Sequence, residues 1–177
     1  ELEIPDGIAS VGGDAFSDCV SVTVRSTISG KPLYKAVTAT DGSSAYNFIL
    51  RNIWDKGGFD FTAQDNYFPA LQDENLQYAI AFSRLMYRVN LSASAEEHYL
   101  DFLHNNAENA VRYCITQDSA ELLGICKENG LITAGNETGL IEFADEQGNT
   151  SAAAFLLTVA NSPEHDNFCD TLSSLEL

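Results

Sequence analysis

The stretch YCITQDSAELLGIC, from Tyr113 to Cys126, holds two of the four cysteines in this chain of 177 residues. Zinc sites usually take cysteines as closer pairs, with two to four residues between them. The C-x-x-C spacing of redox enzymes is also absent from the sequence. The spacing instead favours a local disulfide, Cys114–Cys126, that closes a hairpin or loop. Such a bond is worth about 3 kcal/mol on the chain-entropy model.

The other two cysteines, Cys19 and Cys169, are far apart, and we expect them to tie the two ends of the chain together. Four cysteines allow three pairings, so this connectivity is a hypothesis. An even number of well-separated cysteines is typical of secreted proteins. Three Asn-x-Ser/Thr glycosylation sequons favour the same location, which we predict as extracellular or cell wall, against an intracellular protein with four buried thiols. The sequons begin at Asn90, Asn136 and Asn149.

Outward from the opening stretch, short apolar runs alternate with turn residues. Val20, Val22 and Val24 alternate with polar residues, and a turn at residues 29–32 leads to a second apolar run. This rhythm is typical of β-sandwiches and barrels. We predict one mainly β domain over residues 1–177, an antiparallel β-sandwich or a β-barrel or trefoil-like fold. It would contain at most one or two short helices.

Two segments in the middle of the chain fit either secondary structure. Residues 70–93 carry apolar residues at helical spacing and also in alternation. We favour a strand over residues 77–91, with residues 71–77 as a turn or a single helical turn. In the next segment, Ser94 and Glu97 have the spacing of a capping box and could begin a helix at Ala95, although a strand fits as well. No internal repeat is regular enough to identify. Strands are predicted for residues 110–116, 120–126, 128–134, 138–144 and 151–160.

The charge balance limits the classes of partner. Nine Lys and Arg stand against twenty-six Asp and Glu, for a net charge of −17 and a pI near 4.2. Nucleic acids and anionic membrane surfaces are disfavoured, because both require clustered cations. No apolar run approaches the roughly 18 residues of a membrane helix. We therefore predict a monomer with no nucleic-acid partner and no membrane insertion.

The region with most binding character runs from Trp54 to Phe68, where aromatic and polar residues interleave. Aromatic faces with polar groups at their edges often hold sugars or peptides, although aromatic residues also dominate protein cores. The sequence contains no H-E-x-x-H or G-x-S-x-G motif, and we assign no catalytic, cofactor or metal residues. The candidate ligand-binding residues are Trp54, Phe59, Phe61, Tyr67 and Phe68.

Three segments resemble the fungal phialide cell-wall protein family. They are SVTVRSTISGKPLYKAV near the start, HYLDFLHNNAENAVRYCITQDSAELLGI in the middle and AAFLLTVANSPEHDNFCDTLSSLEL at the end. The resemblance implies a secreted fungal β-protein of the cell wall or apoplast with no catalytic residues. The expected function is non-catalytic binding to a carbohydrate or to a host or cell-surface protein, as a cell-wall protein or a virulence effector. The alternative is an extracellular polysaccharide-active hydrolase or a carbohydrate-binding module.

Overall fold

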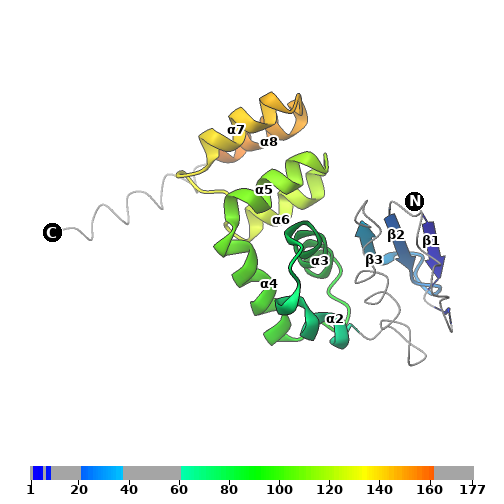
Figure 1. The fold of residues 1–177 in the computed structure, drawn as a ribbon. Helices are drawn as coiled ribbons and strands as arrows, with labels where there is room; N and C mark the ends of the chain where they lie inside the picture. Colours follow the sequence, from blue (N-terminus) through cyan, green and yellow to red (C-terminus); the bar gives the residue numbers. More distant parts are fainter. Residues whose placement is uncertain (1, 6, 9–20, 38–60, 162–177) are drawn as a thin grey trace. The chain divides into compact units, whose positions relative to one another are not determined.

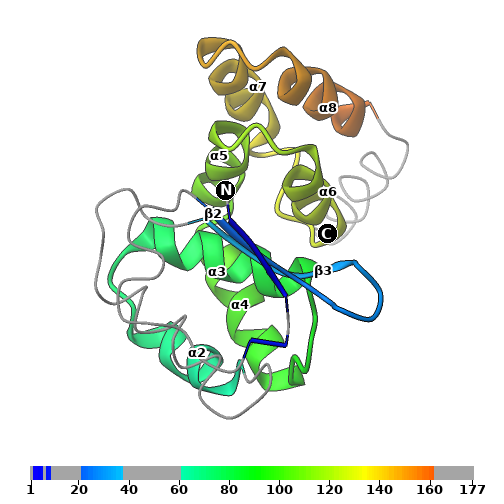
Figure 2. The same cartoon turned by 90° about the vertical axis from the view of Figure 1, so that its right-hand side faces the viewer.

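The computed structural model describes residues 2–5, 7–8, 21–37 and 61–161 of the chain (Figures 1 and 2). The chain divides into two compact units, Glu1–Asp101 and Phe102–Leu177, and each is described separately below. The predicted third strand near residue 45 lies outside the described residues, as do Cys19 and Cys169.

A small sheet belongs to the first unit. It has the order β1 (Leu2–Pro5), β2 (Ser21–Arg25) and β3 (Pro32–Val37), with β1 parallel and β3 antiparallel to β2. The turn between β2 and β3 is held by Ser26, whose Oγ accepts hydrogen bonds from two backbone N–H groups, and by Gly30 at φ +67°. The two predicted strands are confirmed here. The turn begins at Ser26, three residues before its predicted start, and Pro32 already belongs to β3.

Helices make up the rest of the described first unit. They are α2 (Thr62–Tyr67), the short 3₁₀ helix η1 (Phe68–Ala70), α3 (Glu74–Met86) and α4 (Ala93–Asn105), which continues into the second unit. The predicted strand over residues 77–91 is therefore wrong, since most of it lies in α3 and in the connection to α4.

Side-chain caps set where the two longer helices begin. Helix α3 begins after Asp73, whose side chain accepts a hydrogen bond from Leu76 N. Helix α4 begins two residues before the predicted start at Ala95, and its side-chain cap is Ser92 in place of Ser94.

Within the described residues, the second unit contains the end of α4 followed by two helical hairpins. Helices α5 (Ala107–Thr116) and α6 (Ala120–Glu128) form the first, and α7 (Glu137–Glu146) and α8 (Thr150–Ala160) form the second (Figure 1). Helix α5 packs on α7, and α6 packs on α8. The predicted β-sandwich or barrel is thus wrong, and so is the description of the protein as β-rich. The described residues are mostly helical.

The two hairpins are copies of one unit at an offset of 30 residues. Helices α5 and α7 begin and end 30 residues apart, and the N-caps Ser119 and Asn149 have the same separation. The left-handed residues of the two turns, Asp118 at φ +49° and Gly148 at φ +67°, are also 30 residues apart. Four pairs of buried residues also match at this offset. They are Ala110 and Leu140, Cys114 and Ala144, Leu123 and Ala153, and Cys126 and Leu156.

Turn residues explain why strands were expected here. Clusters of Gly, Asn, Asp and Ser mark both β-turns and helix ends. In this chain they cap helices. Ser119 and Asn149 accept hydrogen bonds from the backbone in the first turns of α6 and α8, while Gly130 at φ +68° follows α6. The predicted strand over residues 128–134 is mostly the connection between the two hairpins.

Candidate functional site

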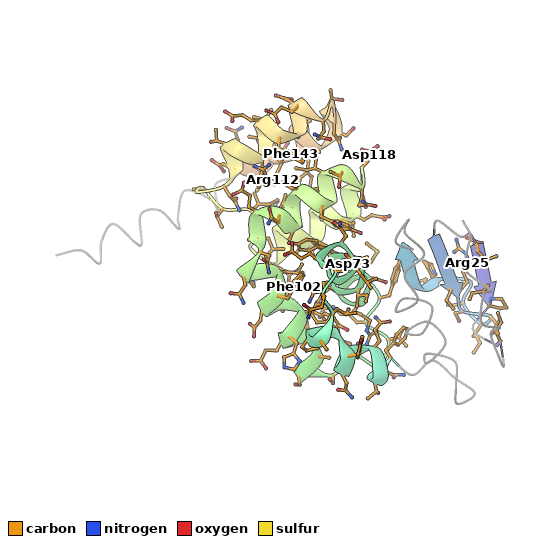
Figure 3. All side chains as sticks on the ribbon, viewed as in Figure 1. Arg25, Asp73, Phe102, Arg112, Asp118 and Phe143 are labelled. Carbon is orange, nitrogen blue, oxygen red and sulfur yellow. The ribbon has the colours of Figure 1, made fainter. Side chains whose placement is uncertain are left out.

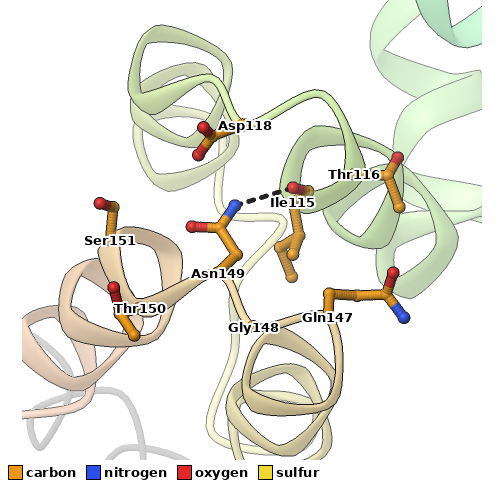
Figure 4. A pocket seen from close by; sticks show the side chains of 8 residues that line it. All are labelled: Ile115, Thr116, Asp118, Gln147, Gly148, Asn149, Thr150 and Ser151. Atoms are coloured by element: carbon orange, nitrogen blue, oxygen red, sulfur yellow. Dashed lines mark hydrogen bonds between the residues drawn. The ribbon is translucent and has the colours of Figure 1, made fainter.

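The turns of the two hairpins enclose a shared open hollow of about 360 Å³ (Figure 4). It lies within the second unit, between the α5–α6 turn and the α7–α8 turn. Only Ile115 among its lining residues is buried, and the others present mainly polar groups. The lining residues are Ile115, Thr116, Asp118, Gln147, Gly148, Asn149, Thr150 and Ser151.

Asn149 connects the two hairpins at the floor of this hollow. Its Oδ1 accepts a hydrogen bond from Ala152 N at 2.9 Å, which caps α8. Its Nδ2 donates to Ile115 O at 2.9 Å, and this bond crosses from the second hairpin to the end of α5 (Figure 4). The Asn149 side chain thus bonds a backbone N–H at the start of α8, which has no partner within that helix, and a backbone carbonyl at the end of α5. The distance between the two turns is therefore set by Asn149.

Asn149→Ala should lower the free energy of unfolding by roughly 2 kcal/mol, because it removes both a helix cap and a partly buried hydrogen bond. Asn149→Ser is the matched control, since Ser119 caps α6 in the first hairpin with a side chain of that type. The serine variant should lose about half as much. Urea unfolding followed by circular dichroism measures both values. Equal losses in the two variants would show that the cap contributes nothing.

The hollow offers both donors and acceptors. Asp118 is exposed and places a carboxylate on one side of the hollow (labelled in Figures 3 and 4). The first turn of α8 lies on the other side. There the N–H groups of Thr150 and Ala152 already donate to Gly148 O and Asn149 Oδ1, so that of Ser151 is the backbone donor of this turn that the hydrogen bonds among the described residues leave for a ligand. Within the described residues, the hydroxyl groups of Thr150 and Ser151 also have no hydrogen-bond partner. Such a surface suits a ligand that carries both kinds of group, as a peptide backbone does.

The two hairpins are held together beside this site by a second contact between α5 and α7. The guanidinium carbon of Arg112 lies 4.6 Å from the centre of the Phe143 ring, and Figure 3 labels both side chains. Arg112 also bonds Glu108 one turn earlier, at 2.7 Å. The ion pair holds the guanidinium in the orientation that covers the ring, which supports a fixed spacing of the two hairpins.

A second group of polar side chains lies inside the first unit. Arg84, which is fully buried, donates two hydrogen bonds to the carboxylate of Asp65, at 2.9 and 3.0 Å. Tyr99 donates its hydroxyl to the same carboxylate at 2.6 Å, and Arg84 also donates to the carbonyls of Tyr87 and Val89. This group joins α2, α3, α4 and the α3–α4 connection. Its groups are occupied by one another, which indicates a structural role.

The candidate ligand-binding aromatics divide into two sets. Trp54 and Phe59 lie outside the described residues. Phe61 and Phe68 are buried, with Arg84 4.2 Å above the Phe61 ring and Tyr99 edge-on to Phe68 at 4.5 Å. Their contacts are those of core residues, the alternative noted from the sequence. Tyr67 is 44% exposed and stays available to a ligand.

The three sequon asparagines have different surroundings. Asn90 is exposed in the α3–α4 connection at φ +50°. Asn136 donates through Nδ2 to Leu131 O and accepts from Thr133 N, and it thereby shapes the connection between the hairpins. Since a glycan would be attached at Nδ2, modification of Asn136 or Asn149 would disturb a hydrogen bond that holds the fold. Glycosylation stays a prediction, with Asn90 the most accessible position.

The structure brings together the two cysteines of the opening stretch. Cys114 on α5 and Cys126 on α6 are buried free thiols with their sulfur atoms 3.5 Å apart. The stretch is a helix–turn–helix and not the β-hairpin that its turn residues favoured. Disulfide formation by this pair stays a prediction.

Sequence reasoning named Asn149 as a sequon but did not identify Asp118, Asn149 and the other residues of the hollow as a common binding site. The 30-residue recurrence of helix ends is the signal that could have found them. Within the described residues, no three His, Cys, Asp or Glu side chains are grouped as a metal site would require, and no helix has the length and apolar character to span a membrane. Comparison of this chain with models of protein families, with curated proteins and with solved structures finds no match.

Proposed function

We propose that the second unit is a binding module that holds an extended, cationic segment of a partner protein across the two hairpin turns. One observation carries this proposal. The 30-residue repeat places equivalent turns next to each other, and their polar groups line one open hollow. Binding in place of catalysis agrees with the expectation from the sequence, while secretion and the cell-wall location stay predictions.

Repeat architecture supports a binding role. Stacked helical hairpins present the same structural position from successive repeats along one side, which creates an extended surface that a chain segment can follow. The likeness to repeat proteins is one of architecture, and the chemistry comes from the side chains of the hollow. The hollow can donate from the Ser151 N–H and accept at Asp118, so it can bond both a C=O and an N–H group of an extended segment.

The charge of the second unit selects the class of segment. Residues 102–161 contain eight Asp and Glu against Arg112 and Lys127, for a net charge of −6. Arg112 is already paired with Glu108. A field of one sign attracts the opposite charge and repels its own, so a partner segment that carries Lys or Arg is favoured. We place one such side chain against the Asp118 carboxylate.

The test uses fluorescence anisotropy with labelled, unstructured peptides that carry Lys or Arg, and with matched peptides that carry Gln or Glu. The cationic peptides should bind, and their affinity should fall as salt rises. Asp118→Asn should weaken binding roughly two- to five-fold, the range of one exposed charge pair. Asparagine tolerates the left-handed backbone of this position, so the turn is preserved.

Glu128→Gln is the matched control. It makes the same change of charge on an exposed residue at the other end of α6, and it should leave binding unchanged. Gln147→Lys places a cation in the hollow at the end of α7, where a positive charge is compatible with the helix dipole, and it should weaken binding more than Asp118→Asn. Equal affinities for Asp118→Asn, Gln147→Lys and the control would overturn the site, and so would binding of neutral oligosaccharides in preference to the peptides.

A further inference from the structure

We propose that Cys114 and Cys126 are a disulfide-forming site that joins helix α5 to helix α6 when the protein meets a low-molecular-weight disulfide such as oxidised glutathione. The two sulfur atoms are 3.5 Å apart, at hydrogen-bonding distance, and both side chains are fully buried. They come from the two helices of one hairpin and are brought face to face across its turn. This proposal is independent of the binding function.

The second hairpin shows that packing does not require thiols at these positions. At the 30-residue offset, Cys114 corresponds to Ala144 and Cys126 corresponds to Leu156. All four residues are completely buried. An alanine and a leucine therefore fill the equivalent space in the second hairpin. Two cysteines placed at facing positions in the first hairpin indicate a chemical role that the Ala144 and Leu156 pair lacks.

The reaction is a pair of thiol–disulfide exchanges. The thiolate of one cysteine attacks a sulfur of the small disulfide, forms a mixed disulfide and releases one small thiolate. The second cysteine then attacks the protein sulfur of the mixed disulfide and releases the other small thiolate. The two cysteine protons pass to the two small thiolates, so the protein loses two hydrogens and the oxidant becomes two thiols.

Burial determines when this reaction can occur. Desolvation and the hydrogen bond between the thiols raise the pKa of Cys114 far above its usual value, and burial, with a smaller effect of Cys114, raises the pKa of Tyr113 to about 12. The thiolate therefore forms only when the hairpin opens. Oxidation should be slow in the folded protein and fast during refolding. Once formed, the bond would hold the turn that supplies Thr116 and Asp118 to the hollow.

The experiment begins with a Cys19→Ser, Cys169→Ser background, in which Cys114 and Cys126 are the remaining thiols. Refolding with oxidised glutathione should remove two hydrogens by intact mass and both thiols by alkylation. The melting temperature should rise by roughly 10 °C over the reduced form. Peptide mapping of the unsubstituted chain, which should recover a peptide linked through Cys114 and Cys126, gives the same test without the serine substitutions.

The matched control copies the second hairpin into the first. Cys114→Ala with Cys126→Leu in the same background should melt near the reduced parent and show no dependence on the oxidant. Three results would overturn the proposal. They are two alkylatable thiols after refolding with oxidised glutathione, stable mixed disulfides with glutathione at both cysteines, and a Cys114–Cys126 bond that leaves the melting temperature unchanged.

Discussion

Arg84→Met should lower the free energy of unfolding by roughly 3–5 kcal/mol, because it leaves the Asp65 carboxylate buried without its cation. Arg84 is fully buried and makes hydrogen bonds to Asp65, Tyr87 and Val89. Methionine is an unbranched side chain that can still pack on the Phe61 ring, where the guanidinium now lies 4.2 Å from the ring centre, so the loss reports the charge, its hydrogen bonds and this cation–π contact. Urea unfolding followed by circular dichroism gives the value.

Arg88→Met is the matched control for this prediction. Arg88 lies four residues later and pairs with Glu96 at 2.6 Å, but its side chain is 53% exposed. The same substitution should therefore cost at most about 1 kcal/mol.

A double-mutant cycle with Asp65→Asn adds a second measurement. The double variant should lose less than the sum of the two single variants, by about 1–3 kcal/mol. Additive losses would show that Asp65 and Arg84 are not coupled, and a cost for Arg84→Met no larger than that for Arg88→Met would contradict the burial of the pair.

Leu156→Ala should lower the free energy of unfolding by roughly 2–5 kcal/mol, the usual cost of a cavity at a fully buried leucine. Leu156 lies on the side of α8 that is buried within the second unit. The change removes the same side-chain atoms as Leu157→Ala at the next residue. Thermal and urea unfolding measure the two variants in parallel.

Leu157 supplies the control, because its side chain is 49% exposed although it is the next residue of α8. Leu157→Ala should change the free energy of unfolding by within about 0.5 kcal/mol, since alanine has the higher helix propensity and little burial is lost. Similar losses of stability in the two variants, or a larger loss for Leu157→Ala, would contradict the burial of Leu156 in the core and the exposure of Leu157.

Local patterns predicted part of the fold. The strands β2 and β3 were predictable because their residues alternate and Gly30 marks a turn between them, whereas the role of Ser26 in that turn appeared only in the structure. The ends of the helices were also marked, since the chain changes direction at Asp118, Gly130 and Gly148. These residues were interpreted as β-turns between strands, whereas they end helices, because the same residue types form β-turns and cap helices.

The type of the segments between these turns was not decided by local sequence. Helices α5 to α8 have 9 to 11 residues, and isolated helices of that length are marginal in water. Their apolar residues fit a strand or a helix over so short a span. Packing of α5 on α7 and of α6 on α8 buries one side of each helix, and this burial selects the helical form.

The sequence by itself determined the charge of −17, the β2–β3 hairpin and the positions at which the chain turns. Only the tertiary structure decided which groups meet. Asp65 and Arg84 are 19 residues apart, and Asn149 reaches Ile115 across 34 residues. The contact between the Cys114 and Cys126 thiols also depends on tertiary structure. Their spacing in the sequence suggested the pair, but they face each other because the turn between α5 and α6 brings the two helices together. Contacts between distant residues depend on how helices stack, and stacking is set by the sum of many weak apolar contacts that no local pattern specifies.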